Sequence, residues 1–168
     1  GSIRMDREEF ISRFGGVFEK SSWIAEVAWG QGIEPQDIDL DSVYRAMVAT
    51  FRGAGGERQI SVLRSHPDLA GRLALAGNLT PESLAEQSSA GLDKCSEAEL
   101  SEFKCLNNKY VEKFKFPFII AVRGLNRQEI LEIFRSRINN SRESEFKEAT
   151  KQVEKIAFLR LQEIFSDD

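Results

Sequence analysis

The sequence predicts an all-α fold, a single domain of roughly seven to nine helices in a compact orthogonal or bundled arrangement. Helix-capping patterns recur along the 168 residues, each followed by apolar residues at helical spacing. Strand patterns are nearly absent, because only residues 116–122 read as β-like and a single strand cannot make a sheet. The twelve phenylalanines supply large side chains for the core.

The first four helices are marked by caps and breakers. Asp6 followed by Glu9 is a capping-box pattern, and Gly15 ends the apolar face that follows it. Asp41 opens the third helix and glycine-rich residues 53–56 break it. The fourth ends before Pro67, because the residue preceding a proline avoids the helical conformation. These helices are expected at 6–14, 22–29, 41–52 and 57–64.

The later helices carry the clearest start signals. Thr80 and Pro81 are an N-cap followed by proline at the first helical position. Capping boxes also pair Ser96 with Glu99 and Asn126 with Glu129. The expected helices span 80–91, 96–114, 126–140 and 141–165.

Composition limits the classes of protein and partner. Residues 5–168 are expected to form one domain, after a tag or disordered N-terminus at 1–4. The formal net charge is −4 and Lys and Arg are spread along the chain, which argues against nucleic acid as a partner. The longest apolar run, 116–122, is far short of the roughly 20 residues that cross a bilayer, so no membrane contact is expected. No signal segment or peroxisomal Ser-Lys-Leu ending is present, and we expect a cytoplasmic protein.

The cysteines and familiar motifs argue against a metal or organic cofactor. Cys95 and Cys105 stand ten apart, the chain has one histidine, and a structural zinc site needs about four such ligands. Both cysteines are expected to be free thiols of a reducing compartment. A phosphate-binding loop, a His-Glu-x-x-His helix and a Gly-x-Ser-x-Gly elbow are all missing.

His66 is the first candidate catalytic residue. It stands in a loop between the end of a helix and Pro67, and imidazole titrates nearest neutral pH. Such a histidine suits acid–base catalysis, although a loop histidine that is merely solvated fits the same pattern.

A polar helix face and one arginine are the other candidates. Ser83, Glu86, Gln87 and Ala90 share one side of the 80–91 helix, which is either a binding face or a solvated surface. Arg160 interrupts the apolar stripe of the last helix, so it either snorkels outward, faces an anion, or pairs with an internal Asp or Glu.

Several strings together resemble the family of OHCU decarboxylases. OHCU is 2-oxo-4-hydroxy-4-carboxy-5-ureidoimidazoline, a late intermediate of urate breakdown. The resemblance extends from about residue 10 to 165 and rests on strings that occur in order. They are Ser65-His66-Pro67-Asp68-Leu69, Ser83-Leu84-Ala85-Glu86-Gln87-Ser88, Ala90-Gly91-Leu92, Asn107-x-x-Tyr110-x-x-Lys113-Phe114, residues 116–122 and Ile156-x-x-Leu159-Arg160-Leu161.

The resemblance implies an all-helical homodimeric carboxy-lyase that needs no cofactor and converts OHCU to (S)-allantoin and carbon dioxide. It implies His66 and Glu86 as catalytic residues. The residues that it implies for substrate binding are Pro67, Ser83, Leu84, Ala85, Glu86, Gln87, Phe118, Ile119, Ile120, Ala121, Val122 and Arg160. The chain departs from the family pattern at Lys115, where many members carry a glycine.

Two alternatives stay open at this point. A non-catalytic helical interaction domain explains the caps and amphipathic helices equally well, and it predicts His66, Glu86 and Arg160 scattered over the surface. A related enzyme acting on another ureido or hydantoin compound is the second alternative. The decarboxylase instead predicts that these three residues converge on one pocket.

Overall fold

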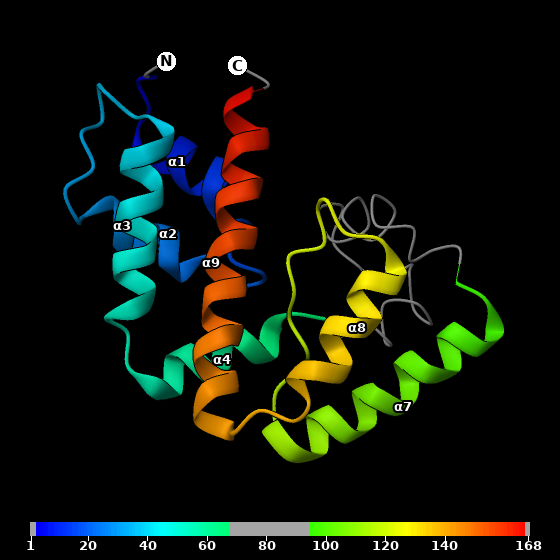
Figure 1. The fold of residues 1–168 in the computed structure, drawn as a ribbon. Coiled ribbons are helices and arrows are strands. Elements are labelled where there is room, and N and C mark those ends of the chain that lie inside the picture. Colours follow the sequence, from blue (N-terminus) through cyan, green and yellow to red (C-terminus); the bar gives the residue numbers. More distant parts are fainter. Residues whose placement is uncertain (1–2, 68–94, 167–168) are drawn as a thin grey trace. The chain divides into compact units, whose positions relative to one another are not determined.

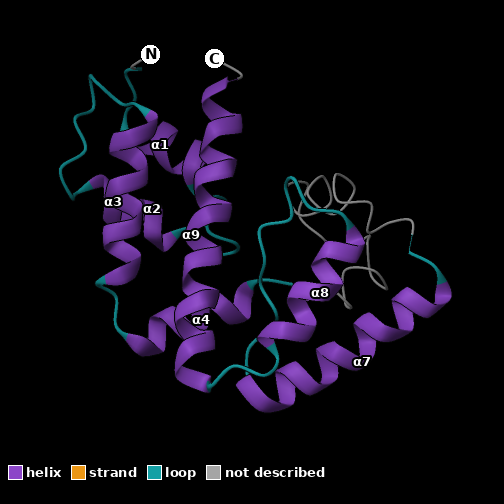
Figure 2. Cartoon of the chain, in the orientation of Figure 1, coloured by secondary structure: helices purple, strands orange, loops and turns teal. Residues whose placement is uncertain are grey.

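The computed structural model describes residues 3–67 and 95–166, and all regular secondary structure in these ranges is helical (Figure 2). The all-α prediction is confirmed. An isolated antiparallel bridge joins Ile3 to Ile38, so the described backbone begins before the expected domain start at residue 5. The helices, labelled in Figure 1, are α1 Arg7–Phe14, α2 Trp23–Trp29, α3 Leu40–Arg52, α4 Gly56–Ser65, α7 Glu97–Phe114, α8 Arg127–Arg137 and α9 Arg142–Ser166.

The chain divides into two compact units. The first comprises Gly1–Ser65 and Val153–Asp168, and its described part contains α1 to α4 and the C-terminal part of α9. Its core is aromatic: Phe10 lies against Phe14 with ring centroids 5.0 Å apart, and Phe14 stacks on Phe165 at 5.5 Å. Apolar side chains of this kind stabilise by about 1.5–3 kcal/mol each when fully buried.

The second unit, His66–Gln152, contains α7, α8 and the N-terminal part of α9 in its described part. Tyr110 is fully buried and touches the rings of Phe114, Phe118 and Phe134. Phe118 stacks on Phe134 with a centroid distance of 3.8 Å. This aromatic cluster fixes the loop between α7 and α8 against both helices.

The predicted caps fix most helix starts. Ser96 and Asn126 each form a reciprocal capping box, with Glu99 and Glu129 respectively, and Asp6 accepts the Glu9 N–H at 2.8 Å. Each cap satisfies backbone N–H groups that otherwise lack a partner at a helix start.

The expected start of the third helix is wrong by two positions. The N-cap is Asp39 rather than Asp41, because the Asp39 carboxylate accepts the Ser42 N–H at 2.8 Å and the Ser42 hydroxyl oxygen accepts the Asp39 N–H at 3.3 Å. Ser42, at the third helical position, has the role that Glu or Gln normally has in a capping box. The expected 80–91 helix lies outside the described residues.

Lys115 ends α7 in a left-handed conformation, with φ 66° and ψ 22°. Its N–H still donates to the carbonyl of Val111 at 2.9 Å. Glycine is the residue that adopts this conformation without steric cost, which explains why glycine is suited to this position.

We therefore expect the free energy of unfolding to depend on which residue occupies position 115. Lys115→Val is expected to lower the free energy of unfolding by about 1 kcal/mol, because a β-branched residue is strained at positive φ. Lys115→Gly should be at least as stable as the original chain. Urea unfolding of the three proteins measures this order, and an unchanged midpoint for the valine variant would contradict it.

Candidate active site

His66 is the first residue after α4 and begins the second unit. Its side chain is 3% exposed, and Pro67 beside it is half-buried. The alternative of a merely solvated loop histidine is therefore wrong. A buried imidazole exchanges its proton away from bulk water, and catalytic histidines are commonly found in such environments.

Arg160 has the internal carboxylate partner that was one of its three alternatives. Its Nη1 donates to Glu19 Oε2 at 2.7 Å, and the side chains of both residues are less than 5% exposed. The same nitrogen also lies 3.4 Å from the carbonyl oxygens of Gly16 and Val17. Arg160 is therefore part of a buried ion pair rather than an isolated positive charge.

The structure does not test whether the predicted catalytic and binding residues lie together. Arg160 belongs to the first unit and His66 to the second. Ser83, Leu84, Ala85, Glu86 and Gln87 lie outside the described residues. The convergence of these residues on one pocket stays a prediction.

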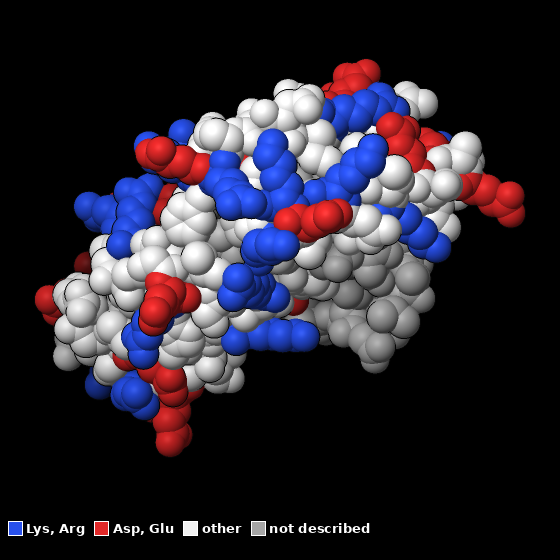
Figure 3. All heavy atoms as spheres, turned by 90° about the horizontal axis from the view of Figure 1, so that it is seen from below, with Lys and Arg blue, Asp and Glu red and all other residues white. Residues whose placement is uncertain are grey.

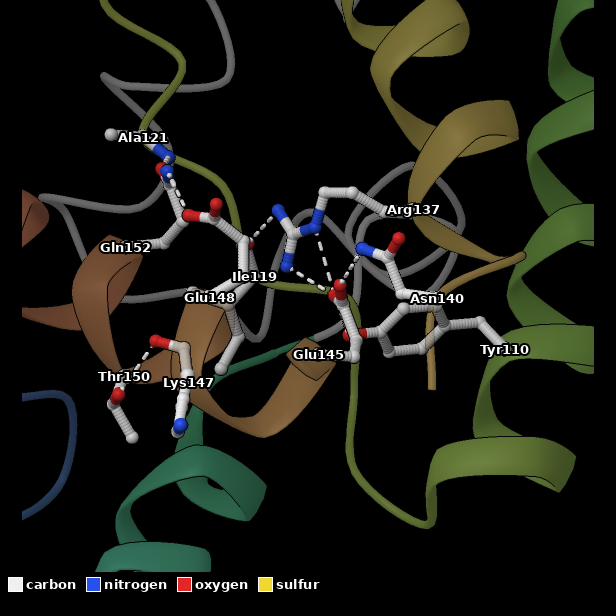
Figure 4. Close-up of polar contacts among 10 residues, drawn as sticks. All are labelled: Tyr110, Ile119, Ala121, Arg137, Asn140, Glu145, Lys147, Glu148, Thr150 and Gln152. Carbon is white, nitrogen blue, oxygen red and sulfur yellow. Dashed lines mark hydrogen bonds and ion pairs between the residues drawn. The ribbon is translucent and has the colours of Figure 1, made fainter. Parts of the chain in front are cut away.

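The predicted substrate-binding residues of the 118–122 segment are all buried. They form no strand within the described structure, as expected for a single β-like run without a partner strand. Side chains hold the backbone instead: Arg137 Nη1 donates to the carbonyl of Ile119 at 2.7 Å, and Gln152 Oε1 accepts the N–H of Ala121 at 2.9 Å (Figure 4). The segment is fixed by α8 and α9 rather than by a sheet.

Arg137 is the centre of a buried polar cluster in the second unit. Its Nε and Nη2 donate to Glu145 Oε2 at 2.8 and 2.6 Å, and the Tyr110 hydroxyl donates to the same oxygen. Asn140 Nδ2 donates to the other carboxylate oxygen at 3.1 Å (Figure 4). Burial, followed by the hydrogen bond to Glu145, raises the pKa of Tyr110 well above its ordinary value. We name Tyr110, Arg137, Asn140 and Glu145 the Arg137 cluster.

The sequence reasoning missed this cluster although a usable signal exists. Ile130, Phe134 and Arg137 follow helical spacing and are all buried, so an arginine ends an apolar stripe just as Arg160 does. Like Arg160, Arg137 is a charged residue on the apolar face of a helix, and such a residue needs a buried partner.

No other feature of the described residues indicates a further functional site. Two surface hollows of about 510 and 820 Å³ occur in the first unit, and they are lined by none of the predicted site residues. No group of three potential metal ligands occurs in the described ranges, and no described helix is long and apolar enough to cross a membrane. Cys95 and Cys105 are not joined in a disulfide. On the face of the molecule shown in Figure 3, both basic Lys and Arg side chains and acidic Asp and Glu side chains are present.

Comparison with known proteins identifies one family throughout. The family model described as OHCU decarboxylase matches residues 3–162. The 2-oxo-4-hydroxy-4-carboxy-5-ureidoimidazoline decarboxylase of Halalkalicoccus jeotgali is 39% identical over 95% of this chain and 86% of its own length. The uric acid degradation bifunctional protein of Bacillus sp. (strain TB-90) is also 39% identical, over 97% of this chain.

The chain spans only part of some of these similar proteins. It covers 31% of the Bacillus protein and 50% of a solved (S)-allantoin synthase chain. That synthase structure matches 95% of this chain with a TM-score of 0.73 and 29% sequence identity. The likeness therefore extends over nearly the whole chain in both sequence and fold.

Proposed function

We propose that this chain, which belongs to the OHCU decarboxylase family, catalyses the decarboxylation of OHCU to (S)-allantoin and carbon dioxide during urate degradation. The observation that carries the proposal is the family match over residues 3–162, within which His66 is buried rather than solvated. As a carboxy-lyase it would act on a small, anionic, planar ring.

The chemistry explains why the reaction proceeds without an organic cofactor. Breaking the bond between the ring carbon and its carboxylate leaves an electron pair that must be delocalised. The adjacent ring C=N of OHCU accepts that pair, so the substrate supplies the electron sink that a cofactor otherwise provides. A proton from one face then fixes the configuration of the new carbon–hydrogen bond.

The protein's part is to orient the substrate and to move a proton. His66 either removes the proton of the 4-hydroxyl as carbon dioxide leaves or protonates the resulting enamine-like carbon. Glu86 would hydrogen-bond His66 or the substrate and set the charge of the imidazole. Ser83, Gln87 and the backbone of residues 118–122 would hold the ring and the ureido group. Arg160 would donate charge-assisted hydrogen bonds to the substrate anion while Glu19 orients its guanidinium.

The burial of two site residues weighs against a non-catalytic interaction domain. That alternative predicts His66 and Arg160 on the surface, whereas both are less than 5% exposed. An enzyme acting on another ureido or hydantoin compound remains the second candidate, because the same donors suit any flat ureide.

The proposal also covers the domain organisation, location, oligomeric state and partners of the protein. We propose that residues 5–168 act as one domain, that the protein is a cytoplasmic homodimer, and that it binds neither membrane nor nucleic acid. The dispersed basic residues and net charge of −4 support the last point.

Purified protein mixed with freshly prepared OHCU tests the function directly. We expect the ultraviolet absorbance of OHCU to fall faster than in buffer, in proportion to the amount of protein and without added metal or cofactor. Hydantoin and allantoate solutions serve as comparison substrates. Loss of a comparison substrate without loss of OHCU would support the second candidate instead.

A further inference from the structure

The backbone of residues 118–122 is buried outside any helix, and only part of it is paired by the protein itself. The carbonyl of Ile119 accepts from Arg137, and the N–H of Ala121 donates to Gln152. Buried peptide groups normally find a partner, because leaving one unpaired costs about as much as a lost hydrogen bond. The carbonyl of Val122 accepts the N–H of Leu125 at 3.0 Å. The other backbone groups of the segment therefore need partners too.

The two groups held by side chains, the Ile119 carbonyl and the Ala121 N–H, belong to alternate residues, which gives the segment two different edges. In an extended backbone, peptide groups of residues two apart point to the same edge, and the segment runs extended between α7 and α8 (Figure 1). Arg137 and Gln152 occupy the edge of Ile119 and Ala121. Within residues 3–67 and 95–166, the N–H groups of Phe118, Ile120 and Val122 donate to no acceptor.

The side chains that hold the first edge are themselves fixed. Glu145 holds Arg137 through Nε and Nη2, and the guanidinium carbon lies 4.4 Å from the centre of the Phe118 ring. The Gln152 amide is oriented because its Nε2 donates to Glu148 Oε2 at 3.1 Å (Figure 4). The Gln152 oxygen is thereby the atom that faces Ala121.

We propose that Arg137 and Gln152 are positioning residues for the decarboxylation, because they turn the N–H groups of Ile120 and Val122 toward the substrate. This inference rests on the proposed function. Two N–H donors two residues apart lie roughly 7 Å from each other, a spacing suited to two acceptor atoms on one flat ureide. The N–H of Ala121, already bonded to Gln152, takes no part in substrate binding.

Gln152→Met tests this arrangement without changing the size of the side chain much. We expect kcat/KM for OHCU to fall about 10- to 100-fold, because small errors in the position of binding groups cost this much. Most of the loss should be in kcat, while far-UV circular dichroism and cooperative unfolding are retained. In a ¹⁵N–¹H spectrum the Ala121 amide signal should move.

Two further variants separate positioning from a general structural effect. The double variant Gln152→Glu with Glu148→Gln keeps an oxygen acceptor for the Ala121 N–H and an amide donor opposite it on α9, and it should restore kcat/KM to within about threefold of the original chain. Lys151→Met, on the exposed neighbour in α9, should leave kcat/KM unchanged. In the unsubstituted chain, adding (S)-allantoin should shift the amide signals of Ile120 and Val122 more than that of Ala121.

Unchanged kcat/KM in Gln152→Met, together with a moved Ala121 signal, would overturn the inference and leave the proposed function standing. Failure of the unsubstituted chain to consume OHCU would overturn the proposed function itself, and the positioning role with it.

Discussion

Replacing His66 with asparagine is expected to lower kcat for OHCU by about 10²–10⁴-fold, the usual contribution of a positioned acid or base. Asparagine retains hydrogen-bonding groups but cannot take up a proton near neutral pH. Because His66 is buried, the variant must first be shown to fold, by far-UV circular dichroism and by an unfolding midpoint near that of the original chain. The rate is then measured from the loss of OHCU absorbance.

Ser61→Ala provides a matched control on the exposed side of α4. Surface substitutions of this kind usually change stability by less than about 0.5 kcal/mol, so turnover should stay near that of the original chain. Near-normal turnover in a folded His66→Asn protein, still giving one enantiomer of allantoin, would contradict the catalytic role of His66.

Arg137→Met is expected to lower the free energy of unfolding by about 3–5 kcal/mol, the largest effect on stability that we predict. The substitution leaves Glu145 fully buried without its ion-pair partner and removes the donor to the carbonyl of Ile119. Urea unfolding followed by circular dichroism measures the change. Burial of an uncompensated charge, rather than loss of contact area, is the physical cause.

Arg135→Met is the control for Arg137→Met, two positions away on α8. Arg135 pairs with Glu102 at 2.6 Å, but its side chain is 51% exposed, so water screens the pair and its loss should lower the free energy of unfolding far less than Arg137→Met does. Combining Arg137→Met with Glu145→Leu should recover part of the lost stability, because no buried charge is then left alone. Equal effects of Arg135→Met and Arg137→Met would contradict the importance of burial.

Local sequence patterns predicted the helices of the described residues well, because caps depend on residues within one turn. The pairs Ser96 with Glu99 and Asn126 with Glu129 form as expected. The start of α3 was misplaced because Asp39 and Asp41 are both good N-cap residues, and the choice depended on Ser42.

Long-range partners were less predictable than helix starts. Arg160 stood out as a charge in an apolar stripe, but Glu19 lies 141 positions away and no local pattern connects the two. The β-like residues 116–122 carry strand propensity without a neighbouring strand, so their backbone is held by Arg137 and Gln152. Propensity describes which side chains fit a surface, whereas pairing depends on the tertiary structure.

The family resemblance supplied what spacing alone left open at His66. Residue type and loop position alone favoured a solvated histidine over a catalytic one, and the burial of His66 in the structure excludes the solvated histidine. The roles of the site residues within 83–87 are inferred from the family resemblance only.

The optical activity of the product shows whether a group of the protein delivers the proton to the ring. Protonation in achiral solution gives equal amounts of both enantiomers, whereas protonation by a group fixed on one side of the ring gives one. Purified chain and OHCU should therefore yield (S)-allantoin with a circular dichroism signal that grows in step with the loss of OHCU. Racemic allantoin, formed at the rate seen in buffer, would contradict the account.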